Sequence, residues 1–279
     1  MALRETMAVP GLTAEQRETF EREGYLVVPG ALDAGGIDRL TESVDRAWEV
    51  NREGTPVAGA EALHLLGFCG SDRRFLEMLD HATTLPLVVD LLGWNIFMYH
   101  CHLDVHPPVV GERPAVWMWH QDGGPENRDL ETDPRPRMSV KLAYFLTDLT
   151  EAGRGNFVVL PGSHLSNTLP RPAEGEPIVD PAGATPVLAA PGDAVLFDRR
   201  LWHRRSDNRS ALTRKAVFFG YTYRWVRVRD DVDVSPGLED AITPVRSQLL
   251  GRGRSSIGYW MPEEDDAPLA AWWAARAAG

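Results

Sequence analysis

The feature that most constrains the fold is a series of short β-rich runs, divided by proline and glycine turns, that fills the middle of the chain. No long stretch of helical periodicity separates these runs. Strands that follow one another between turn signals are typical of antiparallel sandwiches and barrels, and they argue against alternating βαβ units. The runs are Ile96–Val105, Val116–His120, Met138–Leu146, Phe157–Leu160, Ala194–Phe197 and Lys215–Arg229. We therefore expect a mainly β core at about residues 94–229.

Helical patterns flank this core on both sides. Thr13 begins a capping-box pattern, and the helix that it starts is expected to stop at Gly24. The apolar run Tyr25–Val28 predicts a strand, and apolar residues at helical spacing beyond it predict a second helix. An alanine-rich tail with two adjacent tryptophans predicts a last helix at about 266–279, packed on the body or on a partner subunit. We expect one domain of 279 residues whose N-terminal part, about 12–92, is largely helical.

Charge and apolar patterning exclude several classes of protein. A net charge of −11 argues against a nucleic-acid binder, because neutralising phosphates requires a basic face. No apolar run approaches the roughly 20 residues of a membrane span. Glu5 and Pro10 interrupt any apolar segment near the start, so we expect no secretory signal and a cytoplasmic protein. In that reducing compartment Cys69 and Cys101 are expected to be free thiols.

Histidine and aspartate occur twice at a spacing of two residues, and the two occurrences differ in context. In the first, His102, Asp104 and His106 alternate along one predicted strand. The two histidines would lie roughly 13 Å apart, so they would approach an ion from nearly opposite sides. We therefore interpret this set as a polar face that lines a pocket, or as core histidines with satisfied hydrogen bonds, rather than as metal ligands.

The second occurrence, His120-Gln121-Asp122, lies where a predicted strand runs into glycines. Strand ends of a β-barrel surround the mouth of its pocket, and residues two apart on a strand can converge on one ion. His203, which follows another predicted strand, is the best third ligand, although alone it would be interpreted as a half-buried strand-end histidine. Two imidazoles and one carboxylate form the facial triad that holds a non-haem Fe(II) and leaves coordination positions open.

A 2-oxoacid can fill two of these open positions as a chelate. If it also carries a second carboxylate, that group would be buried and would need a charged, preferably bidentate, partner. Arg214 lies eleven residues after His203 and begins the run predicted as the last strand. It is the candidate for this partner.

Taken together, these motifs resemble the phytanoyl-CoA dioxygenase family of Fe(II)/2-oxoglutarate-dependent oxygenases. The resemblance spans about residues 12–225, and the order and spacing of its pieces make the set specific. The pieces are Leu12-Thr13…Phe20…Gly24-Tyr25-Leu26-Val27-Val28-Pro29-Gly30, Trp119-His120-Gln121-Asp122, Leu146-Thr147-Asp148, Val159-Leu160-Pro161-Gly162-Ser163-His164, Pro191-Gly192-Asp193, and His203 with Asn208, Ser210 and Arg214.

The resemblance implies a double-stranded β-helix, the cupin-like jelly roll, with flanking helices. Carried over residue by residue, it implies that His120, Asp122 and His203 bind iron and that Arg214 binds the distal carboxylate of 2-oxoglutarate. It also implies that the enzyme consumes O2, releases succinate and CO2, and hydroxylates or otherwise oxidises its substrate. His164 matches a family feature that is not a ligand, and we expect a structural role for it in its turn.

The chain departs from the family pattern at positions that bear on ligand contacts. Arg205 stands where many members have a small hydroxyl residue two positions after the distal histidine, so that role is unassigned. Lys141 is either a cosubstrate or substrate contact or an ordinary solvated strand lysine. As substrate contacts we expect His102, Trp117, Arg128 and Trp202.

Three alternatives remain open from the sequence. The jelly roll can be a non-catalytic metal-binding module, a zinc hydrolase built on the same ligands, or a fatty acyl-CoA hydroxylase. A small metabolite, of a specialised biosynthetic pathway, is the preferred substrate. We expect a monomer or a homodimer with no nucleic-acid or membrane partner.

Overall fold

The computed structural model describes residues 11–51, 62–112, 114–253, 260–263 and 266–277. The strands are β1 (Tyr25–Val28), β2 (Leu63–Leu66), β3 (Ile96–His106), β4 (Ser139–Phe145), β5 (Phe157–Val159), β6 (Thr185–Pro186), β7 (Ala194–Asp198), β8 (His203–Arg205) and β9 (Arg214–Tyr223). The α-helices are α1 (Ala14–Glu23), α2 (Ala34–Asn51), α3 (Arg73–Glu77), α4 (Leu85–Leu92), α5 (Glu126–Asp129), α6 (Pro244–Leu249) and α7 (Pro268–Ala277). Short 3-10 turns are η1 (Phe68–Ser71), η2 (Ser163–Leu165) and η3 (Glu239–Ala241).

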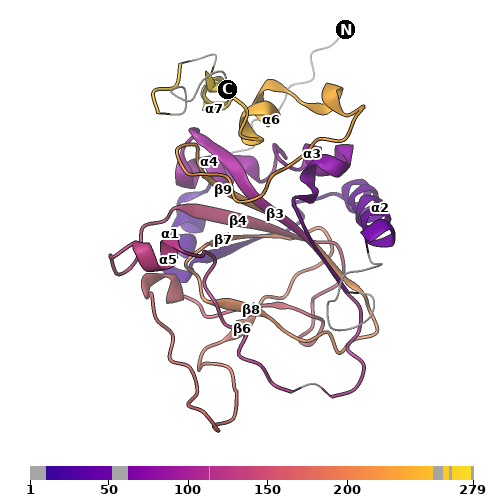
Figure 1. Cartoon of the computed structure of the whole chain (residues 1–279), viewed down its shortest axis with the longest axis vertical. Coiled ribbons are helices and arrows are strands. Elements are labelled where there is room, and N and C mark those ends of the chain that lie inside the picture. The colour runs from indigo at the N-terminus through magenta and orange to yellow at the C-terminus, as the bar shows by residue number, and fades with distance from the viewer. Residues whose placement is uncertain (1–10, 52–61, 113, 254–259, 264–265, 278–279) are drawn as a thin grey trace.

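Two antiparallel sheets face each other, with a second, smaller apolar cluster between them (Figure 1). The larger sheet has the order β1-β7-β4-β9-β3-β2, and the smaller has the order β6-β5-β8. Most neighbours in the larger sheet are not consecutive strands of the chain, as in a wound jelly roll and unlike a meander. This arrangement confirms the mainly β, double-stranded β-helix fold with flanking helices that the sequence predicts.

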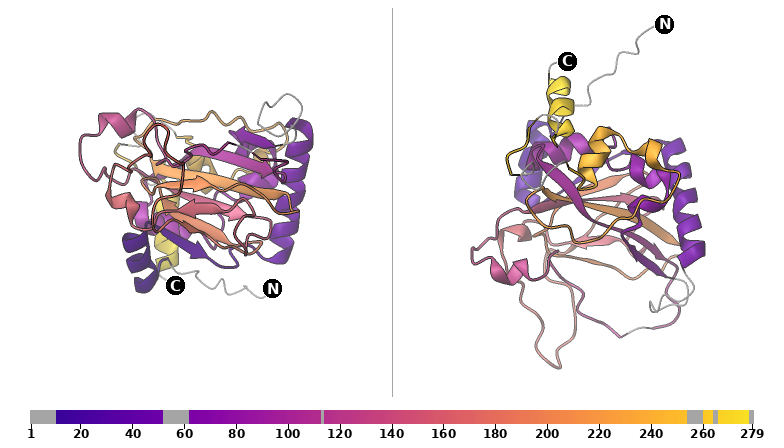
Figure 2. Two further views of the ribbon diagram at one scale, coloured as in Figure 1. Left: turned by 90° about the horizontal axis from the view of Figure 1, so that it is seen from below. Right: turned by 45° about the horizontal axis from the view of Figure 1, so that its top comes forward.

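The helices gather on the outer face of the larger sheet and at its edges (Figures 1 and 2). Helix α1 begins at a capping box formed by Thr13 and Gln16 and ends at Gly24, whose φ of 81° suits glycine. The imidazole of His164 packs against Gly24, so a Cβ there would lie 2.5 Å from the ring nitrogen Nδ1. His164 Nε2 also lies 3.1 Å from the carbonyl oxygen of Glu21, which confirms a structural role for this histidine.

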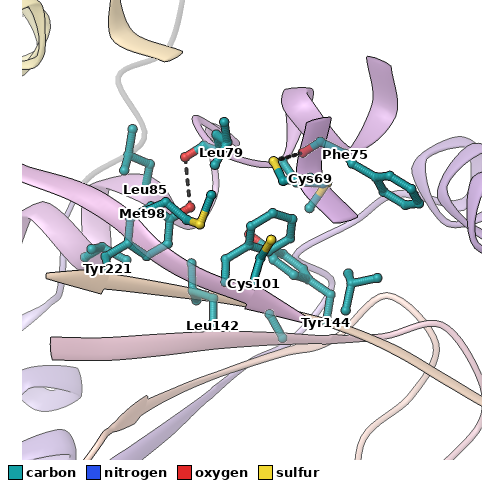
Figure 3. Packing of buried hydrophobic residues seen from close by; sticks show 14 of the residues in the cluster. Cys69, Phe75, Leu79, Leu85, Met98, Cys101, Leu142, Tyr144 and Tyr221 are labelled. Carbon is teal, nitrogen blue, oxygen red and sulfur yellow. Dashed lines mark hydrogen bonds between the residues drawn. The ribbon is translucent and has the colours of Figure 1, made fainter. Parts of the chain in front are cut away.

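The main hydrophobic core lies between these helices and the larger sheet (Figure 3). Met98, Leu142, Tyr144 and Tyr221 project from the strands toward the helical layer, and the Tyr221 hydroxyl donates to the carbonyl of Leu79 at 2.9 Å. Cys69 and Cys101 are buried in the same core as free thiols, as predicted. Burial raises the pKa of Cys101 to about 12, so this thiol is protonated at neutral pH.

Side chains on the opposite face of the larger sheet point toward the smaller sheet. A second apolar cluster fills part of this space and includes Ala143, Phe145, Phe197 and Phe218. Because side chains alternate along a strand, each central strand supplies one set of residues to the helical core and another to this inner chamber.

Three sequence predictions need correction. Val116–His120 is not a strand: only His120 makes an isolated bridge, and Val116 and Met118 are exposed. The last strand ends at Tyr223 rather than Arg229. The N-terminal part also contributes β2, which was not expected from its sequence.

A search of the described residues for helices long and apolar enough to cross a membrane finds none.

Candidate active site

His120, Asp122 and His203 come from distant parts of the chain and meet between the two sheets. The backbone amides of His120 and His203 each donate to the other's carbonyl oxygen at 3.0 Å. The amide of Asp122 donates to the carbonyl of Arg199 at 2.8 Å. Main-chain bonds therefore fix both ligand-bearing segments in one register, independently of any ion.

The two imidazoles are oriented so that their Nε2 atoms are free. His120 Nδ1 lies 2.9 Å from the carbonyl of Met118, and His203 Nδ1 lies 2.8 Å from the carbonyl of Leu201. A carbonyl only accepts, so each Nδ1 carries the hydrogen and each Nε2 presents a lone pair. One ligand atom from each of His120, Asp122 and His203 lies within 4.8 Å of the others, and this is the one such cluster found among the described residues.

Electrostatics keep Asp122 and His203 in the protonation states that a metal requires. Burial lowers the pKa of His203 to about 4, so its ring is neutral at pH 7. Burial alone would raise the pKa of Asp122, but attraction to Lys141 and to both histidines outweighs it and holds that pKa well below its ordinary value. Neutral imidazoles and an ionised carboxylate are the forms that bind a metal.

Lys141 lies on the inner face of β4 and is almost fully buried. Its Nζ lies 2.9 Å from Asp122 Oδ2. The interpretation as a solvated strand lysine is therefore wrong. The ammonium neutralises the carboxylate that belongs to the candidate metal site.

Arg214 begins β9 and lies inside the chamber, 2% exposed. Its guanidinium carbon lies 5.6 Å from the ring centre of Phe145 and 5.9 Å from that of Phe218. The nearest acid is Asp104, whose Oδ2 is 3.6 Å from Nη1, too far for a hydrogen bond. Among the described residues, none accepts a hydrogen bond from Nε or Nη1. Burial lowers the pKa of Arg214 to about 10, which still leaves it charged at pH 7.

The inner face of β3 carries the polar residues His102, Asp104 and His106, all with little exposed surface. His102 stacks on Phe218, with ring centres 4.2 Å apart. Asp104 accepts from His64 Nδ1 at 2.7 Å. These residues are not among the groups whose ligand atoms converge for a metal, in agreement with the sequence analysis.

The other expected substrate contacts are less uniformly placed. Trp117 is half-buried in the segment that leads to His120. Trp202 is half-buried beside His203, and its indole nitrogen donates to the carbonyl of Ser166 at 3.2 Å. Arg128 is exposed on α5, so the structure does not bring it among the buried residues of the site.

The sequence analysis missed the residues that clamp the ligand segments. Asp180 accepts hydrogen bonds from Trp119 Nε1 at 3.0 Å and from Arg204 Nε at 2.6 Å. Trp119 precedes one candidate ligand histidine, and Arg204 follows the other. Asp180 lies between η2 and β6, and no local sequence pattern indicated this contact.

Comparison with known proteins identifies the family. A family model described as phytanoyl-CoA dioxygenase (PhyH) matches residues 20–216. This span covers more than half of the chain and contains His120, Asp122, His203 and Arg214. The chain belongs to the phytanoyl-CoA dioxygenase family. Its membership confirms the predicted class of enzyme, an oxygenase that depends on Fe(II), 2-oxoglutarate and O2.

Relatives of this family member include animal and bacterial enzymes. It is 26% identical to peroxisomal phytanoyl-CoA dioxygenase of Rattus norvegicus over an alignment of 237 residues, which covers 75% of this chain and 68% of the rat protein. It is 26% identical to the ectoine dioxygenase of Stutzerimonas stutzeri over an alignment of 164 residues, which covers 55% of this chain and 51% of that enzyme.

Solved structures share its fold. HygX from Streptomyces hygroscopicus, with nickel and 2-oxoglutarate bound, superimposes with a TM-score of 0.65 at 19% identity, over 82% of this chain and 93% of HygX. EctD from S. alaskensis, with 2-oxoglutarate and 5-hydroxyectoine, gives a TM-score of 0.62 at 19% identity, over 82% of this chain and 85% of EctD.

Proposed function

We propose that this oxygenase hydroxylates, or otherwise oxidises, a small polar metabolite, and that His120, Asp122 and His203 hold its iron. The observation that carries the assignment is the orientation of the two histidines. Each Nδ1 is bound by a carbonyl of its own segment, which leaves both Nε2 lone pairs facing a carboxylate that Lys141 keeps ionised.

The donor set fits Fe(II). His120, Asp122 and His203 would hold the ion through two neutral imidazoles and one carboxylate, and would leave coordination positions open for a chelating 2-oxoacid and O2. When bound, the iron would activate O2 as the oxidant, and 2-oxoglutarate would supply two electrons as it is converted to succinate and CO2. Phe157 and Phe197 pack against the His203 ring, at centre distances of 5.0 and 5.3 Å, and exclude water from that side.

Arg214 supports a site for the distal carboxylate of 2-oxoglutarate. A buried guanidinium with two unpartnered nitrogen atoms is costly unless an anion accepts from it. A carboxylate can accept two parallel hydrogen bonds from one guanidinium. The aromatic rings beside Arg214 hold the group in place and keep the local dielectric low.

Lys141 is proposed as a second cosubstrate-binding cation. Its position beside Asp122 places a positive charge where an anionic 2-oxoacid would approach the metal. Because Asp122 fills the carboxylate position, hydroxylation or a related oxidation is a better fit than halogenation.

The lining of the chamber favours a polar substrate over a fatty acyl chain. The inner face of β3 presents His100, His102, Asp104 and His106 in succession, all largely buried. Covering His102 Nε2 and Asp104 Oδ2 with hydrocarbon would leave these two atoms without hydrogen-bond partners, at a cost of roughly 1–3 kcal/mol each. We propose His102, Trp117 and Trp202 as substrate contacts, with Arg128 reaching the substrate only if α5 approaches the chamber. A cytoplasmic location and a monomeric or homodimeric state remain parts of this proposal.

The test is succinate formation from 2-oxoglutarate with Fe(II) and O2, with and without candidate metabolites. Asp122→Ala should abolish both succinate formation and the binding of Fe(II) or Zn(II) in calorimetry. Asp38→Ala, on the exposed face of α2, is the matched control and should match the unaltered protein. Wild-type rates in Asp122→Ala would refute the ligand assignment, and turnover without O2 would favour the hydrolase alternative.

A further inference from the structure

A chain of hydrogen-bonded side chains leads from the segment after β9 to the inner face of β3. Asp230, from the segment that follows β9, places Oδ2 2.5 Å from His100 Nδ1. His100 Nε2 lies 2.9 Å from His102 Nδ1. All three residues are largely buried. Asp230 itself borders an outer pocket of about 900 Å³ and thus begins the chain outside the chamber.

The first link fixes the tautomer of His100. Asp230 Oδ2 also accepts from the backbone amide of Cys101 at 3.0 Å, and burial, which alone would raise the pKa of Asp230, is outweighed by its hydrogen bonds and by His100, so that pKa is lowered. An ionised carboxylate only accepts, so His100 Nδ1 carries the hydrogen. Burial lowers the pKa of His100, which keeps the ring neutral, and its Nε2 therefore carries a lone pair.

The second link transfers this constraint to His102. Since His100 Nε2 has no hydrogen to donate, His102 Nδ1 must supply the one between them. Burial also lowers the pKa of His102 well below its ordinary value, so this ring is neutral too. His102 Nε2 is left as a hydrogen-bond acceptor. The carboxylate of Asp230 determines this tautomer through His100.

A second acceptor lies beside this atom. Asp104 Oδ2 is 3.9 Å from His102 Nε2, 3.7 Å from His106 Nε2 and 3.6 Å from Arg214 Nη1. Each of these separations exceeds a hydrogen bond, whereas Oδ1 is already bonded to His64. Two acceptors 3.9 Å apart can share one donor group that comes between them.

This acceptor pair lies beside the guanidinium of Arg214. His102 stacks on Phe218, which also contacts the guanidinium of Arg214. Gly220 stands opposite both His100 and Lys141 in the larger sheet, and the ring of Tyr99 fills the space that a side chain at Gly220 would take. Lys141 in turn contacts Asp122.

We propose that Asp230, acting through His100, fixes His102 as a hydrogen-bond acceptor, and that His102 Nε2 and Asp104 Oδ2 together receive a hydroxyl or amino group of the primary substrate. The inference rests on the proposed function and names its substrate class: a polyol, amino sugar or similar metabolite rich in donors. Asp230 is a positioning residue, and His102 and Asp104 are the binding residues.

The tautomer chain is tested by nitrogen NMR of the full chain with ¹⁵N-labelled histidine, loaded with Zn(II) and 2-oxoglutarate. The His102 signals are assigned with His102→Phe, which retains stacking on Phe218. In the unaltered protein, His102 Nε2 should show the shift of an unprotonated imidazole nitrogen. Asp230→Ala should convert it to a mixture of tautomers, whereas Asp231→Ala, at the exposed neighbouring position, should not. A protonated Nε2 in the unaltered protein, or an unchanged tautomer in Asp230→Ala, would overturn the proposal.

The ligand class is tested with the same sample and three probes: myo-inositol, glucosamine and hexadecanoyl-CoA. Movement of the His102 Nε2 signal by myo-inositol or by glucosamine supports a hydroxyl or an amino donor, respectively, and binding should weaken about tenfold or more in His102→Phe. Movement by hexadecanoyl-CoA alone, or by none of the three, overturns the assignment. Binding of Zn(II) and 2-oxoglutarate needs the metal ligands, Arg214 and Lys141 but not His102, so its absence would refute the proposed function separately.

Discussion

Replacing Arg214 with methionine should abolish selectivity for a dicarboxylate cosubstrate while preserving the fold. The guanidinium is buried and offers unpartnered nitrogen atoms to an incoming carboxylate. Hydrogen bonds to charged groups contribute about 1.5–3 kcal/mol each, so a two-point contact is worth about 3–6 kcal/mol. Arg214→Met should therefore raise the KM for 2-oxoglutarate by roughly 10²–10⁴-fold.

Although Arg214→Met should impair cosubstrate binding, it should not lower the stability of the fold. Burial lowers the pKa of Arg214 from 12.5 to about 10, which at 1.36 kcal/mol per pH unit is a cost of about 3 kcal/mol for keeping this group charged in the fold. Methionine fills similar space without that cost. Asp104 would lose an attractive neighbour but keep His106 and His64. The free energy of unfolding in urea should therefore stay equal or rise.

The assay compares 2-oxoglutarate with 2-oxovalerate, which has the same chain length without the distal carboxylate. The unaltered enzyme should prefer 2-oxoglutarate strongly, and Arg214→Met should use both poorly and equally. Arg209→Met, at an exposed arginine paired with Asp207, is the control and should retain the preference. A retained preference in Arg214→Met would refute the reasoning, as would loss of the fold.

Three further predictions follow from buried contacts. Asp198→Asn should destabilise the protein by roughly 3–5 kcal/mol at pH 7, because the largely buried Arg200 loses its carboxylate partner and Arg137 keeps only Glu21. The pKa of Asp198 is lowered, since its arginine contacts outweigh burial, so its contribution is present above the ordinary carboxyl pKa and is lost as pH falls. Urea unfolding should therefore differ less between variant and wild type at pH 3.5 than at pH 7. Asp180→Ala should weaken Zn(II) binding about tenfold or more in calorimetry with unchanged circular dichroism, because Trp119 and Arg204, the neighbours of the two candidate ligand histidines, lose their shared acceptor. Unchanged affinity would show that Asp180 does not hold these segments in place. Gly24→Ala should lower the thermal midpoint through strain at a positive φ and a clash with His164, and an unchanged midpoint would show that the turn relaxes without cost.

Much of the fold was predictable because local signals agreed with the final structure. The capping box at Thr13, the glycine stop at Gly24 and the alternation of β3 each act over a few residues. Val116–His120 failed because a β-rich composition forms a strand only if another strand lies alongside, and pairing is a property of the whole fold. Strand β2 was missed for the complementary reason, since its four residues are stabilised by pairing with β3.

In the candidate site, too, local sequence patterns indicated some residues and not those whose contacts depend on the whole fold. Spacing and order along the chain were enough to nominate His120, Asp122, His203 and Arg214, because a β-barrel brings strand ends together. No sequence pattern indicated that Asp180 would reach two of their neighbours. The role of Asp230 was equally hidden, because it depends on hydrogen-bond direction through two imidazoles.

The alternation along β3 has a consequence for evolvability. Cys101, Leu103 and Val105 hold the strand to the helical layer, whereas the residues between them face the chamber. Selection for a new substrate can exchange the chamber residues one at a time without removing a single side chain from the packing that keeps the protein folded. A lineage built on such a strand can thus diversify its chemistry while its scaffold stays still.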